Sequence, residues 1–263
     1  MKIALGQMTV ERDWRHNLQT VRSLAQQTAA VGGRLLLAPE GIIARDPGDN
    51  DLTQAEAQPL DGPFTAGLLE ISAETGVAVA GTVHVPDPSG RSRNVFVMAD
   101  GGRLIAEYHK LHLYDAFTAK ESDRVSPGDA VPPLVTLDGI AFGLMTCYDV
   151  RFPELARAHA LAGADVLLLP AAWVRGSLKE QHWQTLVTAR ALENTVYVVA
   201  TGETSARNIG RSMVVAPFGV TIAAAGEKPA LVVAEIDRDL IQAARTTMPV
   251  LANTRFAAPV LTP

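Results

Sequence analysis

The stretch GIAFGLMTCYDVRFPEL, residues 139–155, predicts a buried strand that runs into a short turn and then into a helix. Its first half is apolar, and Pro153 suits the first turn of the helix that follows. This order places Cys147 at the carboxyl end of the strand, where ligands of α/β sheets tend to lie. The layout is similar to the sharp turn called the nucleophile elbow, although the motif differs.

Other short runs rich in Val, Ile and Leu recur along the chain, and Gly, Pro or Asp bound each of them, as is usual for buried strands. They cover residues 3–6, 35–38, 77–84, 94–98, 104–108, 165–169, 197–201, 212–216 and 231–236. Helical periodicity appears between some of them, around 18–25 and at 64–75, 153–161 and 179–194. Hairpin-like turns at 87–90 and 100–102 indicate mixed rather than purely parallel sheets. The pattern predicts an α/β layered domain.

Length and composition agree with one such domain over residues 1–263. Hydrophobic residues make up 48% and charged residues 19% of the chain, which leaves ample material for a buried core. The tail, about 247–263, shows no clear element of its own. We expect it to pack on a partner subunit, which predicts a homodimer or a larger homo-oligomer.

The charge and the cysteine content limit the classes of binding partner and the cellular compartment that we expect. The net charge is −5 and no basic stripe appears, so binding to nucleic acid is not expected. No apolar run approaches the roughly 18 residues that a membrane helix needs. The single cysteine cannot form an internal disulfide, and the N-terminus begins directly with a strand-like pattern rather than a signal peptide. We expect a cytoplasmic protein that acts on a small molecule.

Two further polar residues close buried strands. Glu40 follows the run at 35–38, and the burial expected there would raise its pKa, which suits a general base. Lys110 follows the run at 104–108, and its ammonium could stabilise the negative charge that develops during amide hydrolysis. A helix that begins near Cys147 would favour its thiolate, the nucleophilic form. Taken singly, each residue has an ordinary structural interpretation; their shared position at strand ends favours a hydrolase.

The residues are also compatible with other interpretations of the function. A Cys–His hydrolase would use His109, His112 or His182 as the base, if one of them lay within hydrogen-bond reach of Cys147. A metal site is less favoured because no HExxH motif is present, and the chemistry requires no cofactor. A non-catalytic binding or scaffold protein is the alternative from another class. Rapid alkylation of Cys147 by iodoacetamide, with protection by a ligand, would favour the enzyme.

Three blocks of the sequence resemble the catalytic blocks of the nitrilase superfamily of carbon–nitrogen hydrolases. They are APEG at 38–41, YHKLHLYD at 108–115 and GLMTCYDVRFPEL at 143–155, in the order of the family. The match continues through LPAAW at 169–173, HW at 182–183 and ARALEN at 189–194. The resemblance covers nearly the whole chain. It implies a four-layer αββα sandwich and a Glu–Lys–Cys triad that works without metal or cofactor.

Carried over to this sequence, the resemblance makes Glu40 the general base, Lys110 the lysine that stabilises the oxyanion, and Cys147 the nucleophile. Glu121 fits the second glutamate that the family often has between the lysine and cysteine blocks. It is expected to orient Lys110 or the substrate amide. The backbone N–H of Tyr148, directly after the nucleophile, is the expected second donor to the oxyanion.

Two stretches, HKLHLYDAF at 109–117 and PAAWVRGSLKE at 170–180, are most similar to bacterial deaminated glutathione amidases. They are also similar to ω-amidases that act on α-ketoglutaramate, and another aliphatic amidase is a further alternative. The expected reaction is hydrolysis of a terminal carboxamide through a cysteine thioester, with ammonia as the leaving group. An acidic or keto-acid substrate calls for a cation near the nucleophile. The candidate substrate-binding residues are Tyr114, Trp173, Arg175 and Arg207.

Replacement of Cys147 by alanine should abolish hydrolysis, because no thioester can form without the sulfur. The fold should remain intact, because the change removes a single side-chain atom. Ammonia or amine release measures the first effect and circular dichroism the second. Retained turnover in this variant would end the thiol mechanism.

Overall fold

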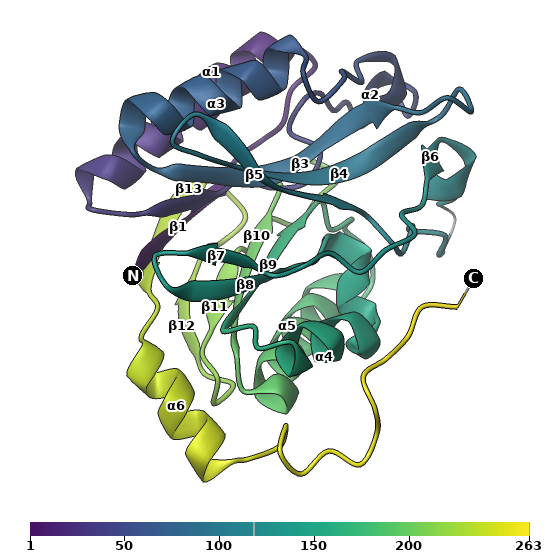
Figure 1. Ribbon diagram of the computed structural model, residues 1–263. Helices are drawn as coiled ribbons and strands as arrows, with labels where there is room; N and C mark the ends of the chain where they lie inside the picture. The colour runs from purple at the N-terminus through teal and green to yellow at the C-terminus, as the bar shows by residue number, and fades with distance from the viewer. Residues whose placement is uncertain (118, 263) are drawn as a thin grey trace.

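Two stacked β-sheets with helices on both outer faces make up the protein, as the computed structural model shows (Figure 1). The structure describes residues 1–117 and 119–262. The layers run helix, sheet, sheet, helix, so the predicted αββα sandwich is confirmed.

The first sheet has the strand order β13-β1-β2-β3-β4-β5, and β6 pairs with β4. Its strands are β1 (Lys2–Gln7), β2 (Leu35–Leu37), β3 (Ala78–Pro86), β4 (Ser92–Asp100), β5 (Arg103–His109), β6 (Val125–Ser126) and β13 (Ala230–Glu235). Strands β1, β2 and β3 run parallel, whereas β3, β4 and β5 form antiparallel hairpins. The predicted turn at 87–90 joins β3 to β4, and the predicted turn at 100–102 joins β4 to β5. The prediction of a mixed sheet is therefore confirmed.

The second sheet has the strand order β12-β11-β10-β9-β8-β7. Its strands are β7 (Val135–Leu137), β8 (Ile140–Leu144), β9 (Val166–Ala171), β10 (Tyr197–Gly202), β11 (Met213–Val215) and β12 (Thr221–Ala224). The central strands β8, β9 and β10 run parallel, and the outer ones are antiparallel to their neighbours.

Helices cover the outer face of each sheet (Figure 1). The α-helices of the described residues are α1 (Trp14–Ala30), α2 (Leu52–Ala55), α3 (Pro63–Thr75), α4 (Pro153–Leu161), α5 (Lys179–Asn194) and α6 (Arg238–Thr247). Helices α1 and α3 lie on the first sheet, and α4 and α5 lie on the second. Two short 3₁₀ helices, η1 (Glu121–Asp123) and η2 (Cys147–Arg151), follow strands near one end of the sandwich. In the described residues, no helix combines the length and the apolar character required to cross a membrane.

Strand β2 shows why the apolar runs of this chain are continuous rather than alternating. Leu35 and Leu37 belong to the core between the sheets, whereas Leu36 belongs to the core between the first sheet and its helices. Successive side chains of a strand point to opposite faces, so a strand covered on both sides needs apolar residues at every position. All three leucines are fully buried.

Some elements were not predicted from the sequence. These are helices α2 and α6 and strands β6, β7 and β12. Helix α6 is strongly amphipathic, with Ile241 and Ala244 buried on one face, so its periodicity was overlooked in the sequence rather than absent from it. Strand β12 is a short edge strand whose side chains are mostly exposed, so the sequence shows no alternation of buried and exposed positions there. After α6 the chain continues outside both sheets (Figure 1), and its docking on a partner subunit stays a prediction.

Gly143 sets the distance between β8 and α4, and therefore the position of the turn that carries Cys147. A Cβ atom at Gly143 would lie 2.7 Å from His159 Cβ and 2.9 Å from Leu167 Cδ2. Gly143→Ala should lower the free energy of unfolding by about 1–3 kcal/mol, the usual cost of overpacking. Gly226→Ala is the matched control, because a Cβ there meets no atom within 4 Å. Equal urea-unfolding midpoints for the two variants would contradict the expectation.

Candidate active site

Four strands deliver polar groups to one end of the sandwich. Glu40 follows β2, Lys110 follows β5, Cys147 lies three residues after β8 and Ala172 follows β9. Backbone hydrogen bonds extend the strands up to these residues: the Ala38 N–H donates to Ala80 O at 2.7 Å, and the Lys110 N–H donates to Asn94 O at 2.9 Å. Because two strands come from each sheet, the groups meet only when the sheets are stacked.

Glu40 is buried and makes contacts from both sheets. Its Oε1 accepts hydrogen bonds from Lys110 Nζ at 3.0 Å and Asn94 Nδ2 at 2.7 Å, and its Oε2 accepts one from the Ala172 N–H at 2.8 Å. Burial would raise the pKa of Glu40, but the charges of Lys110 and Arg45 outweigh burial and hold the pKa well below its usual value. The expected rise in this pKa is therefore wrong.

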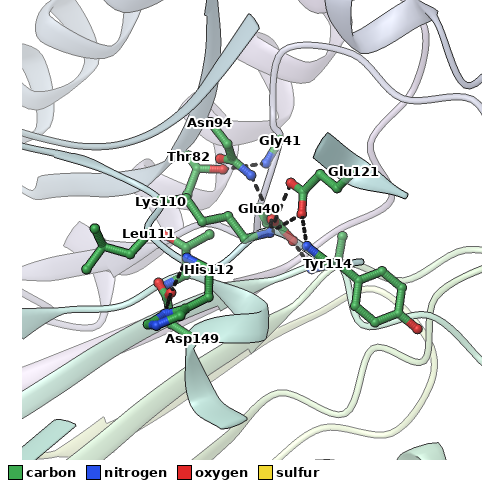
Figure 2. Close-up of polar contacts among 12 residues, drawn as sticks. Glu40, Gly41, Thr82, Asn94, Lys110, Leu111, His112, Tyr114, Glu121 and Asp149 are labelled. Atoms are coloured by element: carbon green, nitrogen blue, oxygen red, sulfur yellow. Dashed lines mark hydrogen bonds and ion pairs between the residues drawn. The ribbon is translucent and has the colours of Figure 1, made fainter. Parts of the chain in front are cut away.

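Lys110 joins two carboxylates, as Figure 2 shows. Its Nζ lies 3.0 Å from Glu40 Oε1 and 2.9 Å from Glu121 Oε2, and its side chain is 2% exposed. Burial disfavours the ammonium, but Glu121 and Glu40 outweigh burial and raise the pKa of Lys110 far above its usual value. The Tyr114 N–H also donates to Glu121 Oε2, which fixes the second carboxylate beside the lysine.

Cys147 occupies a sharp turn. Its φ is +47°, in the left-handed region that residues with a side chain rarely adopt, and its thiol lies beside the Glu40 carboxylate. Burial and the negative charge of Glu40 raise the pKa of the thiol well above its usual value. The sequence-based expectation of a stabilised thiolate is wrong for the unliganded site, because these effects exceed that of Lys110.

Asp149 fixes this turn to the loop that carries Lys110. Its Oδ1 accepts hydrogen bonds from the backbone N–H and the Nδ1 of His112, at 3.1 and 2.7 Å. Its Oδ2 accepts from Tyr108 Oη at 2.8 Å and from the Thr146 N–H at 2.7 Å. The carboxylate is fully buried and thus ties the end of β5 to the end of β8 (Figure 2).

A cavity of about 700 Å³ opens onto these groups. Glu40, Lys110, Glu121 and Cys147 all line it. The four predicted substrate-binding residues line it as well: Tyr114, Trp173, Arg175 and Arg207. The structure thus brings every predicted side chain of the site to one cavity.

The backbone N–H of Tyr148 has the freedom that an oxyanion donor needs. Tyr148 is the second residue of η2, and the first N–H groups of a helix have no partner within it. Among the residues that the structure describes, no acceptor takes a hydrogen bond from this N–H. The Tyr148 ring packs edge-on against the Tyr114 ring, with centroids 5.2 Å apart.

Comparisons with known proteins agree with this geometry. Residues 2–246 match the model of the carbon-nitrogen hydrolase family. The chain belongs to the carbon–nitrogen hydrolase family.

Individual relatives extend over the full length of the chain. The sequence is 49% identical to a deaminated glutathione amidase of Escherichia coli O157:H7, over 99% of this chain and 100% of that one. Saccharomyces cerevisiae Nit3, a member of branch 10 of the nitrilase superfamily, has a similar structure, with a TM-score of 0.86, 28% identity and 97% of each chain covered. The NitN amidase of Nesterenkonia sp. AN1 gives a TM-score of 0.83 at 27% identity, over 97% of this chain and 96% of that one. The predicted superfamily is confirmed.

The three histidines considered as bases in this carbon–nitrogen hydrolase have other partners than Cys147. His109 contacts Glu107 at 3.1 Å, His112 binds Asp149, and His182 lies 3.4 Å from Arg151. The thiol lies beside the Glu40 carboxylate instead, which disfavours a Cys–His hydrolase. Within residues 1–117 and 119–262, no group of three His, Cys, Asp or Glu side chains is arranged to hold a metal ion.

Sequence reasoning missed three residues of the site. Asn94 donates to Glu40, Arg45 Nη2 lies 3.9 Å from Glu40 Oε2, and Lys179 lines the cavity. Asn94 lies inside a strand, where an isolated asparagine gives no signal of its own. Lys179 begins α5 and reads as the solvated end of a helix, although it is 4% exposed.

Asp149→Asn should lower both stability and activity. Each oxygen of Asp149 accepts two hydrogen bonds, so an amide NH₂ in either position faces two donors. We expect the free energy of unfolding to fall by about 2–4 kcal/mol. We expect kcat to fall about tenfold to a hundredfold, because the turn of Cys147 shifts.

Chemical denaturation and steady-state kinetics measure the two effects. Asp129→Asn is the control, because Asp129 is exposed. Wild-type stability in Asp149→Asn would show that the carboxylate does not hold the turn.

Proposed function

We propose that this carbon–nitrogen hydrolase is an amidase that hydrolyses deaminated glutathione, N-(4-oxoglutaryl)-cysteinylglycine, through a thioester at Cys147. The contact of a buried, ionised Glu40 with both the Cys147 thiol and the Lys110 ammonium carries the reaction type. The 49% identity to a deaminated glutathione amidase supports the substrate. α-Ketoglutaramate and simple aliphatic amides are the alternative substrates.

The charges of the site define the roles in the unliganded enzyme. Glu40 is ionised and the thiol of Cys147 keeps its proton, because the pKa of the first is lowered and that of the second is raised. Glu40 is thus ready to accept a proton when the sulfur attacks, which is the role of a general base. Lys110 stays protonated throughout, so it acts as a fixed positive charge rather than as an acid.

In the first half of the reaction, the sulfur of Cys147 attacks the amide carbon while its proton passes to Glu40. The negative charge that develops on the carbonyl oxygen is held by the Lys110 ammonium and the Tyr148 N–H. The proton on Glu40 then passes to the leaving nitrogen, the carbon–nitrogen bond breaks, and a thioester remains. An active-site cysteine is also reported for the Nesterenkonia amidase, as its adduct with acrylamide.

In the second half, Glu40 takes a proton from water as the water oxygen attacks the thioester. The same two donors hold the second oxyanion. Collapse of this intermediate breaks the carbon–sulfur bond, releases the acid and returns the proton to the thiol. Glu121 keeps the Lys110 ammonium in place through both halves and orients the substrate amide.

The leaving group depends on the substrate. Deaminated glutathione has no primary carboxamide; its oxoglutaryl group is joined to the amine of cysteinylglycine. We therefore assign this amine as the leaving group and the oxoglutaryl group as the acyl part of the thioester. Ammonia, the leaving group expected from the sequence, applies to α-ketoglutaramate and other primary amides.

The cavity offers groups for both ends of such a substrate. Tyr114 and Trp173 present aromatic surface beside Cys147, and Trp173 is held by a bond from its Nε1 to Lys179 O at 3.0 Å. Arg207 is exposed at the cavity and contacts Asn50 Oδ1 at 2.9 Å, so it can bind a carboxylate at the entrance. Arg175 is paired with Glu227 at 3.1 Å and orders the cavity wall.

The assembly and the cellular location are further parts of the proposal. Residues 1–263 form one domain, and the tail, about 247–263, packs on a partner subunit of a homodimer or larger homo-oligomer. Exposed apolar residues of the tail, Phe256 and Val260, support this arrangement because they are 87% and 89% exposed in the single chain. A nucleophile that must remain a free thiol favours the cytoplasm, where thiols are kept reduced.

A substrate panel tests the function. Purified enzyme is assayed with deaminated glutathione, α-ketoglutaramate, a neutral aliphatic amide, a nitrile and an N-carbamoyl compound, each with the Cys147→Ala variant as control. The proposal expects the highest kcat/KM for deaminated glutathione and no turnover in the control. A preference for the nitrile or the carbamoyl compound would refute the substrate but leave the thiol mechanism standing.

The pH dependence tests Glu40 as the base. Because its pKa is lowered, kcat/KM should stay level from pH 8 down to about pH 5 and fall only below the ordinary glutamate value of about 4.3. The stability that Glu40 contributes should be fully present above about pH 4.3 and be lost as the pH falls further towards the folded-state pKa. A histidine base would place the acidic limb near pH 6.5 instead.

A further inference from the structure

Lys179 is a buried lysine in the wall of the catalytic cavity. It is the first residue of α5 and is 4% exposed, although the preceding residue, Leu178, is 61% exposed and has a φ of +59°. Lysine is rarely buried without a partner of opposite charge, and a cation at the N-terminus of a helix is opposed by the helix dipole. Stability alone therefore does not account for a lysine at this position.

Aromatic rings surround Lys179, and the nearest charge that acts on it is the positive charge of Arg151. Its Nζ donates a hydrogen bond to Tyr114 Oη at 2.8 Å. It also lies 4.0 Å from the centre of the Phe117 ring, 4.9 Å from that of Tyr114 and 5.4 Å from that of Trp173. Ring faces attract the ammonium but do not neutralise it. An ammonium has three N–H donors, and the phenol accepts one of them.

No carboxylate of the described residues lies within 4 Å of Lys179 Nζ. The other lysines of the cavity differ in this respect. Lys110 is paired with Glu40 and Glu121, and Lys120 is paired with Asp123 at 3.2 Å. Lys179 is thus a buried cation of the cavity without an anion.

Two effects disfavour the charge of Lys179. Burial and the positive charge of Arg151 lower the pKa of Lys179, whereas the neighbourhood of Cys147 opposes this change. An anion placed in the cavity would relieve both the burial and the repulsion from Arg151. Lys179 and Cys147 line the same cavity, so a substrate whose amide reaches the sulfur can also reach the ammonium.

We propose that Lys179 binds the carboxylate at the far end of the substrate's acyl chain and thereby selects acidic amides over neutral ones. The inference rests on the proposed amidase function and deepens it, because the 2-oxo acid of the acyl group supplies such a carboxylate. A neutral amide of equal length leaves the ammonium without an anion. A site built for a charged group discriminates strongly against an analogue that lacks it.

The test compares two amides of equal chain length. Glutaramate ends in a carboxylate, and pentanamide carries a methyl group in the same place. Lys179→Met keeps an unbranched apolar side chain and removes the charge. It should lower kcat/KM for glutaramate at least about 30-fold, mainly through KM, because truncation leaves the carboxylate unpaired. For pentanamide the change should be less than about threefold, which also shows that the variant is folded.

Two further variants distinguish a direct contact of Lys179 with the substrate carboxylate from the effect of the overall charge of the cavity. Lys120→Met removes the same charge from an exposed lysine of the cavity, whose side chain is 67% exposed, and should change neither amide more than about threefold. Lys179→Arg retains the charge and should restore part of the preference for glutaramate.

Several results would overturn the inference. They are equal kcat/KM values of the two amides in the wild type, no hydrolysis of glutaramate, or an equal loss on both amides in Lys179→Met. Failure of the proposed function has a different signature. If the wild type does not hydrolyse deaminated glutathione but Lys179→Met loses the preference for glutaramate, the proposed substrate is wrong and the role of Lys179 stands.

Discussion

The buried ion pair between Glu40 and Lys110 is the interaction on which the site depends. Their side chains are 4% and 2% exposed, and charges so far from water are costly unless they are paired and hydrogen-bonded. Glu121 completes the partners of the ammonium, while Asn94 and the Ala172 N–H complete those of the carboxylate. These partners come from both sheets. The ion pair therefore has its full set of hydrogen bonds only when the two sheets are packed together.

The same ion pair determines the protonation state of Cys147. Two carboxylates share one ammonium, and the nearby Arg45 adds a second positive charge beside Glu40. An ionised sulfur would add a further negative charge at a buried position beside Glu40. Cys147 therefore keeps its proton next to an ionised Glu40, and in the proposed mechanism the thiolate forms only when a substrate carbonyl accepts the charge.

Geometry at Cys147 is maintained by the residues around it rather than by its own preference. A positive φ at a cysteine is unfavourable and persists only where the surroundings impose it. Asp149 supplies this restraint through four hydrogen bonds from three residues, Tyr108, His112 and Thr146. One carboxylate therefore holds together the strand end that carries the lysine and the turn that carries the sulfur.

The sequence by itself determined the layered α/β fold, because strands covered on both faces need continuous apolar runs such as the three leucines of β2. It also pointed to Glu40, Lys110 and Cys147, since each is a reactive residue at the end of such a run. Strand β12 is mostly exposed, so its sequence carries no sign of a buried face. Helix α6 is amphipathic, and its periodicity was present in the sequence but overlooked. Local sequence could not give the protonation states. Burial alone predicts a raised pKa for Glu40, and only the tertiary structure brings Lys110 and Arg45 close enough to reverse that direction. Likewise, only the tertiary structure buries Lys179 among aromatic rings, because its neighbours in space lie far from it in the chain.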